Sequence, residues 1–177
     1  MTLDELRESL PEYAKDLKLN LSTVLRQPEL SAPQTWGTAL ACAAACHNDE
    51  LLDVIARESE PYLDETARNA ALGAAAVMAM NNIYYRFLHL ASNKKYSTMR
   101  AGLRMNIIRT HGGDPADFEL WCLAVSAING CGSCVDSHEQ VVRQKGITED
   151  QVLAAIRIAA VLHEAARVLE TEAVLAG

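Results

Sequence analysis

The feature that most constrains the fold is a nearly unbroken series of helix signals along the chain. Thr2, Ser31 and Thr148 each precede a Glu or Gln by three positions, which is the pattern of a helix-capping box. Apolar residues then recur at intervals of three and four, as on one face of a helix. No segment alternates polar and apolar residues for long enough to predict a strand. The sequence therefore predicts an all-α protein.

Composition supports this fold class. Half of the residues are hydrophobic but only 5% are aromatic, and the apolar content consists mainly of Ala and Leu. These residues favour helix, whereas β-branched and aromatic residues favour sheet. A length of 177 residues corresponds to about one domain. We therefore expect residues 1–177 to form a single all-α domain.

Charge and hydropathy exclude several classes of partner. Sixteen basic and 23 acidic residues give a net charge of −7, and no run of basic residues of the kind that binds nucleic acid or anionic membranes is present. The longest apolar stretch, residues 70–80, is too short to span a bilayer. The N-terminus carries acids where a signal peptide has a basic start. We expect a cytoplasmic protein with no nucleic-acid or membrane partner.

Helix breaks divide the chain into segments. Pro28, the stretch 92–97 and the loop at 111–115 interrupt the helical pattern, and Asp114 followed by Pro115 predicts a helix start. The expected helices cover residues 12–25, 31–44, 49–55, 64–90, 115–128, 131–146 and 148–169.

Two halves of the chain resemble each other. Trp36 precedes Cys46 by ten positions, and Trp121 precedes Cys131 by the same interval. We interpret this as a duplicated helical unit, with coincidence in an Ala-rich chain as the alternative. A second cysteine follows three residues later only in the second half, which is therefore expected to hold the active site. The predicted halves cover residues of about 30–90 and 115–175.

The motif that carries chemistry is Cys131-x-x-Cys134, which follows a helix break at Asn129-Gly130. Free amide N–H groups and the positive end of a helix dipole stabilise a thiolate at such a position. A Cys-x-x-Cys arrangement at a helix start lowers a cysteine pKa from about 8.5 into the range of roughly 3.5–7.5. Residues three apart are neighbours on a helix, so the two sulfurs are also placed to form a disulfide.

Two further residues extend this motif. His138 lies four residues beyond Cys134, so both share one helix face. Glu119 lies on the preceding predicted helix, and a reversal at Asn129-Gly130 would bring its carboxylate over the cysteine helix. A carboxylate in contact with His138 would fix the imidazole tautomer and raise its basicity.

Two other interpretations of the motif remain open at this point. Cys131, Cys134 and His138 also suit three ligands of a zinc ion, for which Cys122 or His111 would have to supply the fourth. The two cysteines would be inert in the other interpretation. The pattern favours a redox dithiol, since no second pair at metal-ligand spacing is present.

The remaining candidates are expected to be structural. Cys42, Cys46 and Cys122 lie among apolar residues and are expected to be small buried hydrophobes. Trp36 and Trp121 are expected in the core. Surface or capping positions are expected for His47, His89, His111 and His163. Arg100 and Arg104 are expected at the surface, with pairing to Glu119 or an interface acid as the alternative.

The residues also resemble a known family. Glu119-x(11)-Cys131-x(2)-Cys134-x(3)-His138 is similar to the signature of the bacterial alkyl hydroperoxide reductase AhpD family, within the carboxymuconolactone decarboxylase-like superfamily. The similarity extends over nearly the whole chain. It includes the segments LPEYAKDLKLNLS (10–22), ARNAALGAAAVMAMNN (67–82), GLRMNII (102–108) and FELWCLAVSAINGC (118–131).

The resemblance implies an AhpD-like bundle of duplicated helical units that assembles as a homotrimer. It implies an antioxidant thiol peroxidase that reduces organic hydroperoxides and regenerates an AhpC-type peroxiredoxin. Electrons would come from dihydrolipoamide on a lipoylated acyltransferase, recharged by dihydrolipoamide dehydrogenase, with no tightly bound cofactor. A zinc-stabilised interaction module and a decarboxylase-like enzyme on the same fold are the alternatives; the intact dithiol counts against the decarboxylase.

The resemblance also assigns roles. Cys134 would attack the peroxide and become a sulfenic acid, and Cys131 would donate a proton and then close the disulfide. His138 and Glu119 would form the proton relay. Some relatives carry a His between the two cysteines, where this chain has Ser133, so no proton transfer is assigned to that position.

Overall fold

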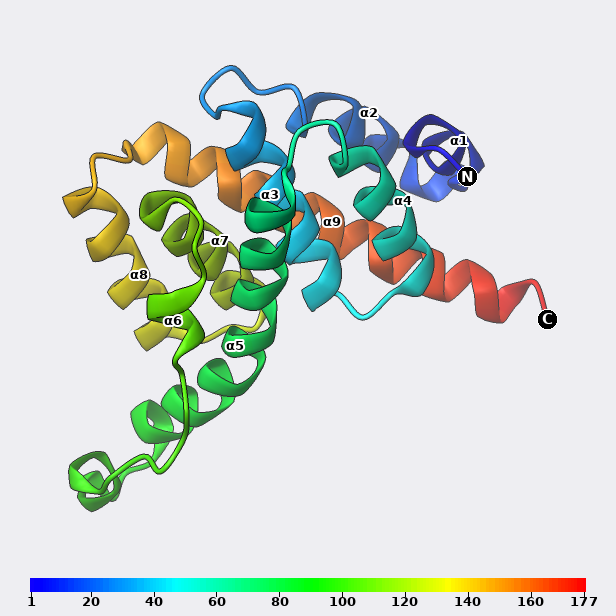
Figure 1. Ribbon diagram of the computed structural model, residues 1–177. Helices are drawn as coiled ribbons and strands as arrows, with labels where there is room; N and C mark the ends of the chain where they lie inside the picture. Colours follow the sequence, from blue (N-terminus) through cyan, green and yellow to red (C-terminus); the bar gives the residue numbers. More distant parts are fainter.

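The computed structural model describes residues 1–177, and every regular element in it is a helix, so the all-α prediction is confirmed (Figure 1). The elements in chain order are α1 (Leu3–Ser9), η1 (Glu12–Ala14), α2 (Lys15–Val24), α3 (Ala32–Ala45), α4 (Asp49–Ser59), α5 (Glu65–Leu90), η2 (Lys94–Thr98), α6 (Ile107–Thr110), α7 (Pro115–Ile128), α8 (Gly132–Gln144) and α9 (Glu149–Leu175).

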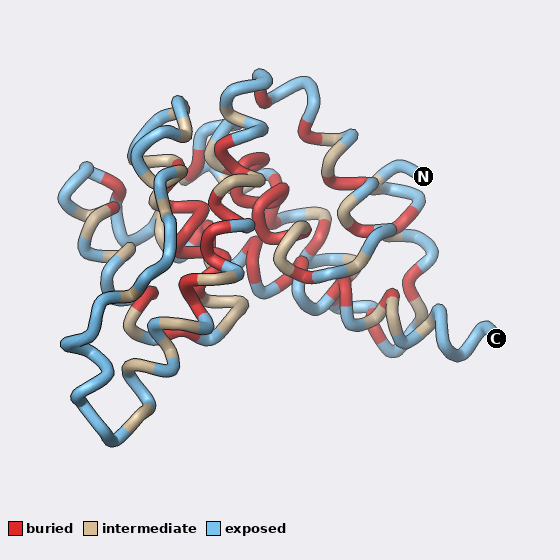
Figure 2. Tube along the Cα trace, turned by 60° about the horizontal axis from the view of Figure 1, so that its bottom comes forward, coloured by how far each residue is buried: buried red, intermediate tan, exposed pale blue.

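Helices α3 and α7 form the centre of the molecule, and each of the long helices α5 and α9 packs on both. Forty-three buried hydrophobic residues form one continuous cluster, and the buried positions of the trace gather at this centre (Figure 2). Small residues allow the close approach: the indole of Trp121 on α7 occupies the space that a Cβ at Gly37 on α3 would need. Any larger residue at position 37 would therefore force the two central helices apart.

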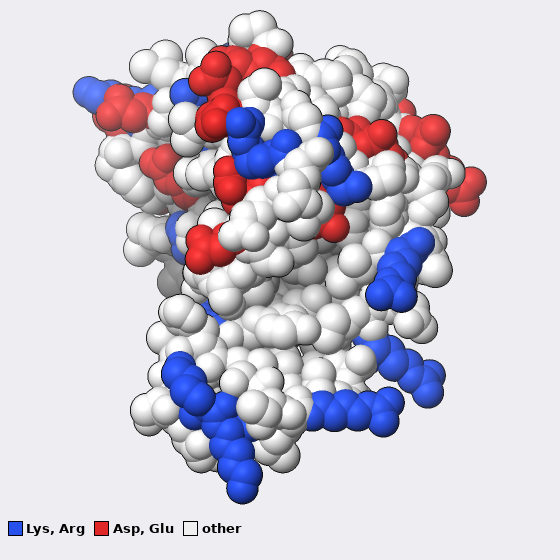
Figure 3. Space-filling view, turned by 90° about the vertical axis from the view of Figure 1, so that its left-hand side faces the viewer, with Lys and Arg blue, Asp and Glu red and all other residues white.

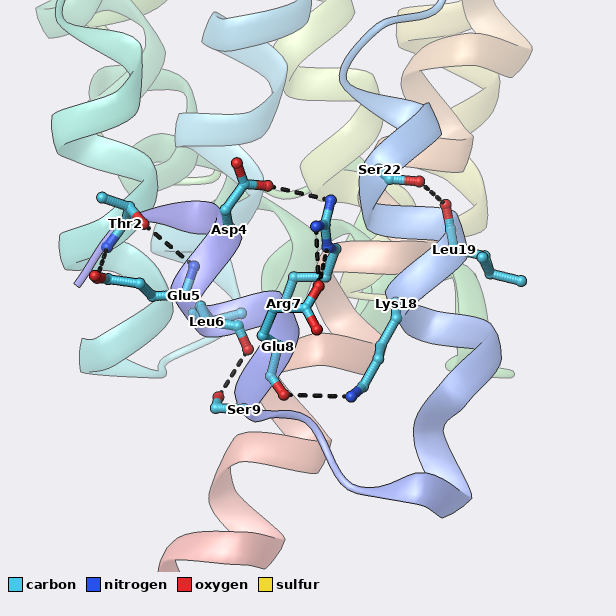
Figure 4. Close-up of polar contacts among 10 residues, drawn as sticks. All are labelled: Thr2, Asp4, Glu5, Leu6, Arg7, Glu8, Ser9, Lys18, Leu19 and Ser22. Atoms are coloured by element: carbon cyan, nitrogen blue, oxygen red, sulfur yellow. Dashed lines mark hydrogen bonds and ion pairs between the residues drawn. The ribbon is translucent and has the colours of Figure 1, made fainter.

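The predicted capping boxes at Thr2, Ser31 and Thr148 are all present. In the first, the Thr2 hydroxyl accepts from the Glu5 amide at 3.2 Å, and a Glu5 carboxylate oxygen accepts from the Thr2 amide at 2.8 Å (Figure 4). Lys18 on α2 donates to the backbone carbonyl of Glu8 at 3.3 Å. Helix α1 is thus fixed at its start by the cap and tied to α2.

The helix ends correct one detail of the sequence interpretation. Helices α3 and α7 both have 14 residues, and their starts lie 83 positions apart, whereas the spacing of the Trp and Cys residues suggested 85. Cys46 is the C-cap of α3, while Cys131 is the N-cap of α8. The two cysteines therefore occupy different positions in their helical hairpins, because a shared ten-residue spacing does not record where each helix ends. The division into two related halves stays a prediction.

Residues 83–106, which we call the arm, start beside α8, run out from the body of the molecule and return to it. They comprise the last turns of α5, η2 and the return to α6 (Figure 1). The arm contains five basic residues and no acidic residue, and Lys and Arg are the only charged side chains in the lower part of Figure 3. Its exposed apolar side chains are Ile83, Tyr85, Phe87, Leu90, Tyr96, Met99 and Leu103.

None of the helices combines the length and the apolar character that crossing a membrane requires. The two longest, α5 and α9, have 26 and 27 residues.

Candidate active site

Helix α7 carries the first site residue. Asp114 caps its start by accepting from the amides of Ala116 and Asp117 at 2.7 and 3.0 Å, and Pro115 occupies the first helical position, as predicted. Most of the helix is buried. Glu119 lies between buried Phe118 and Leu120 and keeps only 15% of its side-chain surface exposed. Its carboxylate is therefore largely shielded from solvent.

The chain then reverses at Asn129-Gly130. Gly130 has a φ of 66°, a left-handed conformation that glycine adopts without the steric cost of a Cβ. Cys131 is the N-cap of α8 and makes no side-chain capping hydrogen bond. The start of α8 therefore has no side-chain cap, and Cys131 lies at the positive end of the helix dipole.

Cys131 and Cys134 form a disulfide, with their Cα atoms 5.3 Å apart. The two sulfurs differ in access: Cys131 is fully buried, whereas Cys134 is 6% exposed. Ser133 lies beside them, with its hydroxyl 3.6 Å from the sulfur of Cys131. The pair can thus store two electrons, and the sulfur open to an incoming molecule is that of Cys134.

His138 and Glu119 are brought together across α7 and α8, where the predicted reversal placed them. The imidazole Nδ1 lies 2.6 Å from a carboxylate oxygen of Glu119, and only 13% of the His138 side chain is exposed. A carboxylate at Nδ1 favours the tautomer in which Nδ1 carries the proton and Nε2 is free to accept one. A His–Glu pair of this geometry has the chemistry to take and return a proton.

Cys134, His138 and Glu119 line one pocket of about 370 Å³, which Cys131 does not reach. Helix α5 and the segment that leads into and through α6 form its remaining walls. The other lining residues are Asn81, Tyr85, Met105, Ile108, Ser133, Ser137 and Val141. The pocket therefore has a polar end with the reactive groups and an apolar wall.

A polar network behind the site holds the reversal between α7 and α8. Asn82 donates to the hydroxyl of Ser126 at 2.9 Å and accepts from the side chain of Asn129 at 2.9 Å. Arg86 donates to the backbone carbonyl of Asn129 at 2.5 Å. These contacts fix the C-terminus of α7, and with it the starting point of the cysteine helix.

Sequence reasoning missed the contribution of α5. Asn81 and Asn82 were placed only within the predicted helix of residues 64–90 and given no role, but both are buried and both lie next to the site. A signal was present: buried Asn side chains are uncommon, and two in succession in an apolar helix indicate a polar requirement.

The other candidates are structural. Burial raises the pKa of Cys46 to about 11 and raises those of Cys42 and Cys122 well above the usual thiol value, so all three stay protonated at neutral pH. Trp36 and Trp121 are buried, as expected. Exposed positions are occupied by His47, His89, His163, Arg100 and Arg104.

One histidine differs in part from its expected place. His111 is only partly exposed and stacks on Phe118, with ring centroids 4.1 Å apart. It is the C-cap residue of α6, and its Nδ1 accepts from the amide of Gly113 at 3.1 Å within the loop before α7. Burial lowers the pKa of this imidazole.

No group of three or more His, Cys, Asp or Glu side chains is placed to hold a metal ion. His111, one of the two residues considered as a fourth zinc ligand, is engaged with Phe118 and Gly113. Cys122 is completely buried in the core. The ligand set that a zinc-stabilised module requires is therefore not assembled.

The fold and the dithiol site together define a class of helical proteins. The description of the family model that matches residues 95–176 is the carboxymuconolactone decarboxylase family. That match covers α6 to α9 and includes all four site residues predicted from the sequence.

Similarity to individual proteins is closer and covers nearly the whole chain. Alkyl hydroperoxide reductase AhpD of Solibacter usitatus is 59% identical over 98% of both chains. The AhpD of Koribacter versatilis is 57% identical over 97% of this chain and 89% of its own. The AhpD of Streptomyces avermitilis is 51% identical over 99% of both. This chain belongs to the alkyl hydroperoxide reductase AhpD family.

Proposed function

We propose that this protein is an antioxidant thiol peroxidase that reduces organic hydroperoxides by cycling Cys131 and Cys134 between dithiol and disulfide. The observation that carries the proposal is the pocket in which the accessible sulfur of Cys134 lies with the Glu119–His138 pair. The names of the relatives support the same activity.

The oxidative half-reaction begins with proton transfer from the Cys134 thiol to Nε2 of His138, while Glu119 stabilises the resulting imidazolium. The thiolate attacks the terminal oxygen of ROOH, so that an S–O bond forms and the O–O bond breaks. Sulfur is oxidised to a sulfenic acid, and the alkoxide leaves. Cys131 gives its proton to the alkoxide, which becomes the alcohol ROH.

Disulfide formation completes this half. The Cys131 thiolate, at the N-terminus of α8, attacks the sulfenic sulfur of Cys134 and displaces hydroxide. The hydroxide takes the proton held by His138 and leaves as water. One hydroperoxide is thereby reduced to alcohol and water, and two thiols become one disulfide.

The reductive half-reaction uses a dithiol donor. One thiolate of dihydrolipoamide attacks the disulfide to form a mixed disulfide, and its second thiol displaces the protein sulfur to give lipoamide. Access through the pocket favours attack on Cys134. The proposed donors are a lipoylated acyltransferase and dihydrolipoamide dehydrogenase, and an AhpC-type peroxiredoxin is the proposed recipient of electrons.

The proposal includes a homotrimer, as the resemblance to the family implies, and a cytoplasmic location, as the acidic N-terminal residues suggest. A decarboxylase-like reaction is the other candidate that the description of the matching family suggests. It is disfavoured because a decarboxylation consumes no electrons and gives the Cys131–Cys134 pair no task.

Intact mass and peptide mapping of the reduced protein, before and after one equivalent of an organic hydroperoxide, test the proposal. We expect the loss of two hydrogen atoms, mapped to Cys131 and Cys134 and reversed by dihydrolipoamide. Thiols that the hydroperoxide leaves untouched would overturn it, and bound zinc in the native spectrum would revive the structural alternative.

A further inference from the structure

Two neighbouring asparagines on α5 are equally buried but differ in their hydrogen bonding. Asn82 uses its donor and its acceptor, through Ser126 and Asn129. Asn81 is 4% exposed, and its side-chain oxygen has no hydrogen-bond partner in the protein. A buried polar atom without a partner is unfavourable for folding, so its presence calls for a reason other than stability.

Asn81 also lies beside the reacting sulfur. It lines the same pocket as Cys134 and His138, and its backbone carbonyl oxygen is 4.0 Å from the sulfur of Cys134. Two other buried side-chain atoms lack partners, on Glu29 and Trp121, but neither residue lines this pocket. Of these three unpaired atoms, the Asn81 oxygen alone belongs to a residue that lines the pocket of Cys134.

The chemistry of the amide matches that of a hydroperoxide. An ROOH molecule has one O–H donor and two oxygen acceptors, and a primary amide has both an N–H donor and a carbonyl acceptor. The amide offers one group of each kind whichever way it is turned. Tyr85, Met105 and Ile108 supply an apolar wall of the same pocket for the organic group.

We infer that Asn81 binds the hydroperoxide: its amide donates to a peroxide oxygen and accepts from the terminal O–H, so that this oxygen faces Cys134. The inference rests on the proposed function and assigns the substrate-binding residue of that site. Asn81 neither gives nor takes electrons; the S–O bond still forms as the O–O bond breaks. A donor directed at the breaking bond also stabilises the charge that develops on the leaving oxygen.

The test compares two reactions of the reduced full-length protein at one pH. The first is oxidation of Cys134 by tert-butyl hydroperoxide, whose rate is measured by stopped flow. The second is labelling of Cys134 by methyl methanethiolsulfonate, which reacts with the thiolate but offers no O–O bond. For Asn81→Leu we expect oxidation to be slower by about 100-fold, as on loss of one donor to a developing anion. The labelling rate should stay within about twofold, since this reagent offers no peroxide oxygen for the amide to bind.

Stability supplies a second readout. Asn81→Leu replaces an unpaired buried amide by an apolar group of similar size, so we expect an equal or higher Tm. The matched control is Asn82→Ala, which removes the contacts to Ser126 and Asn129. It should lower the Tm and change oxidation and labelling by the same factor. Asn81→Ala serves as a second variant at the position if Leu impairs folding.

Three results would overturn the inference. Oxidation of the Asn81→Leu protein as fast as that of the wild type removes Asn81 from substrate binding. Equal slowing of oxidation and labelling makes its role structural, and a selective loss in Asn82→Ala removes its specificity. If wild-type protein reacts with methyl methanethiolsulfonate but not with the hydroperoxide, the proposed function fails as well, so the two failures are distinguishable.

Discussion

The helical hairpins α3–α4 and α7–α8 have closely matching architecture but opposite content. When their helix starts are aligned, 83 positions apart, Cys134 and His138 on α8 correspond to Leu51 and Ile55 on α4. Both apolar residues are completely buried. The face that α4 uses to close the core is therefore the face on which α8 carries its thiol and imidazole.

The same alignment places Glu119 opposite Trp36, which stacks on Tyr62 with ring centroids 5.0 Å apart. A carboxylate thus stands on α7 where α3 has an aromatic anchor. The two hairpins thus differ at three positions, where one has apolar side chains and the other has a carboxylate, a thiol and an imidazole. The reactive site therefore depends on these side chains rather than on a special backbone conformation.

The caps of the two second helices differ in the same sense. Asn48 caps α4 by accepting from the amide of Leu51 at 2.9 Å. Cys131 stands at the equivalent position and provides no such bond. The residue before it is Gly130 in one hairpin and His47 in the other, both with positive φ. Helix α8 thus lacks the stabilising side-chain cap of α4 and has a cysteine at that position.

The greatest loss of activity is expected for a cysteine of the α7–α8 hairpin, whereas a cysteine of the α3–α4 hairpin should be dispensable. Cys134→Ser should lower hydroperoxide reduction by about 10³-fold or more, because the nucleophile is removed. Cys46→Ala should leave the rate within about twofold, since the Cys46 pKa of about 11 keeps that thiol protonated. Turnover with dihydrolipoamide and an organic hydroperoxide measures both. A fully active Cys134→Ser protein would contradict the assignment.

A smaller loss is expected at the carboxylate. Glu119→Gln keeps the shape of the side chain but cannot stabilise the imidazolium of His138, so the oxidation of Cys134 should slow by about 10²-fold. The Tm should change little, because the amide can still accept from Nδ1. Single-turnover oxidation across pH 5–9 measures the effect. An unchanged rate would remove Glu119 from the relay.

The sequence alone predicted the features that depend on residues close together in the chain, and it missed those that depend on the packing of distant helices. Capping boxes and the shared face of Cys134 and His138 depend on residues three or four apart, so the pattern predicted them. The contact of Glu119 with His138 depends on the crossing of α7 and α8 and was predictable only on condition of the reversal. Asn81 was missed because its role arises from the packing of α5 against α8, 53 residues away in sequence.

Substitutions at the two helix caps should change the stability of the protein in opposite directions. Asn48→Ala should lower the free energy of unfolding by about 1 kcal/mol, because an amide at the start of α4 loses its partner. Cys131→Ser introduces a good capping residue and should raise the stability of the reduced protein, by at most about 1 kcal/mol. Urea unfolding under reducing conditions measures both changes. An Asn48→Ala protein as stable as the wild type would show that the cap is not what distinguishes the two hairpins.

The smallest effect is expected at alkaline pH. Burial raises the pKa of Cys46 from 9.0 to about 11, while the charge of Arg167 opposes the shift. The folded state therefore retains a proton that the unfolded state loses, so this contribution to stability is complete below pH 9 and declines as the pH rises through about 11. Cys46→Ala should show a shallower decline in Tm between pH 8 and 11. Parallel curves for the two proteins would exclude the contribution.

The arm has a consequence for how the molecule meets other charged bodies. Five positive charges lie on the arm, so the remainder of the chain carries −12 although the total is only −7. The protein is thus a strong electric dipole, and its net charge is a poor guide to its encounters. The field will orient a charged partner toward one end of the protein before contact. The encounter rate will fall as ionic strength rises, since salt screens this field over about 8 Å at physiological concentration.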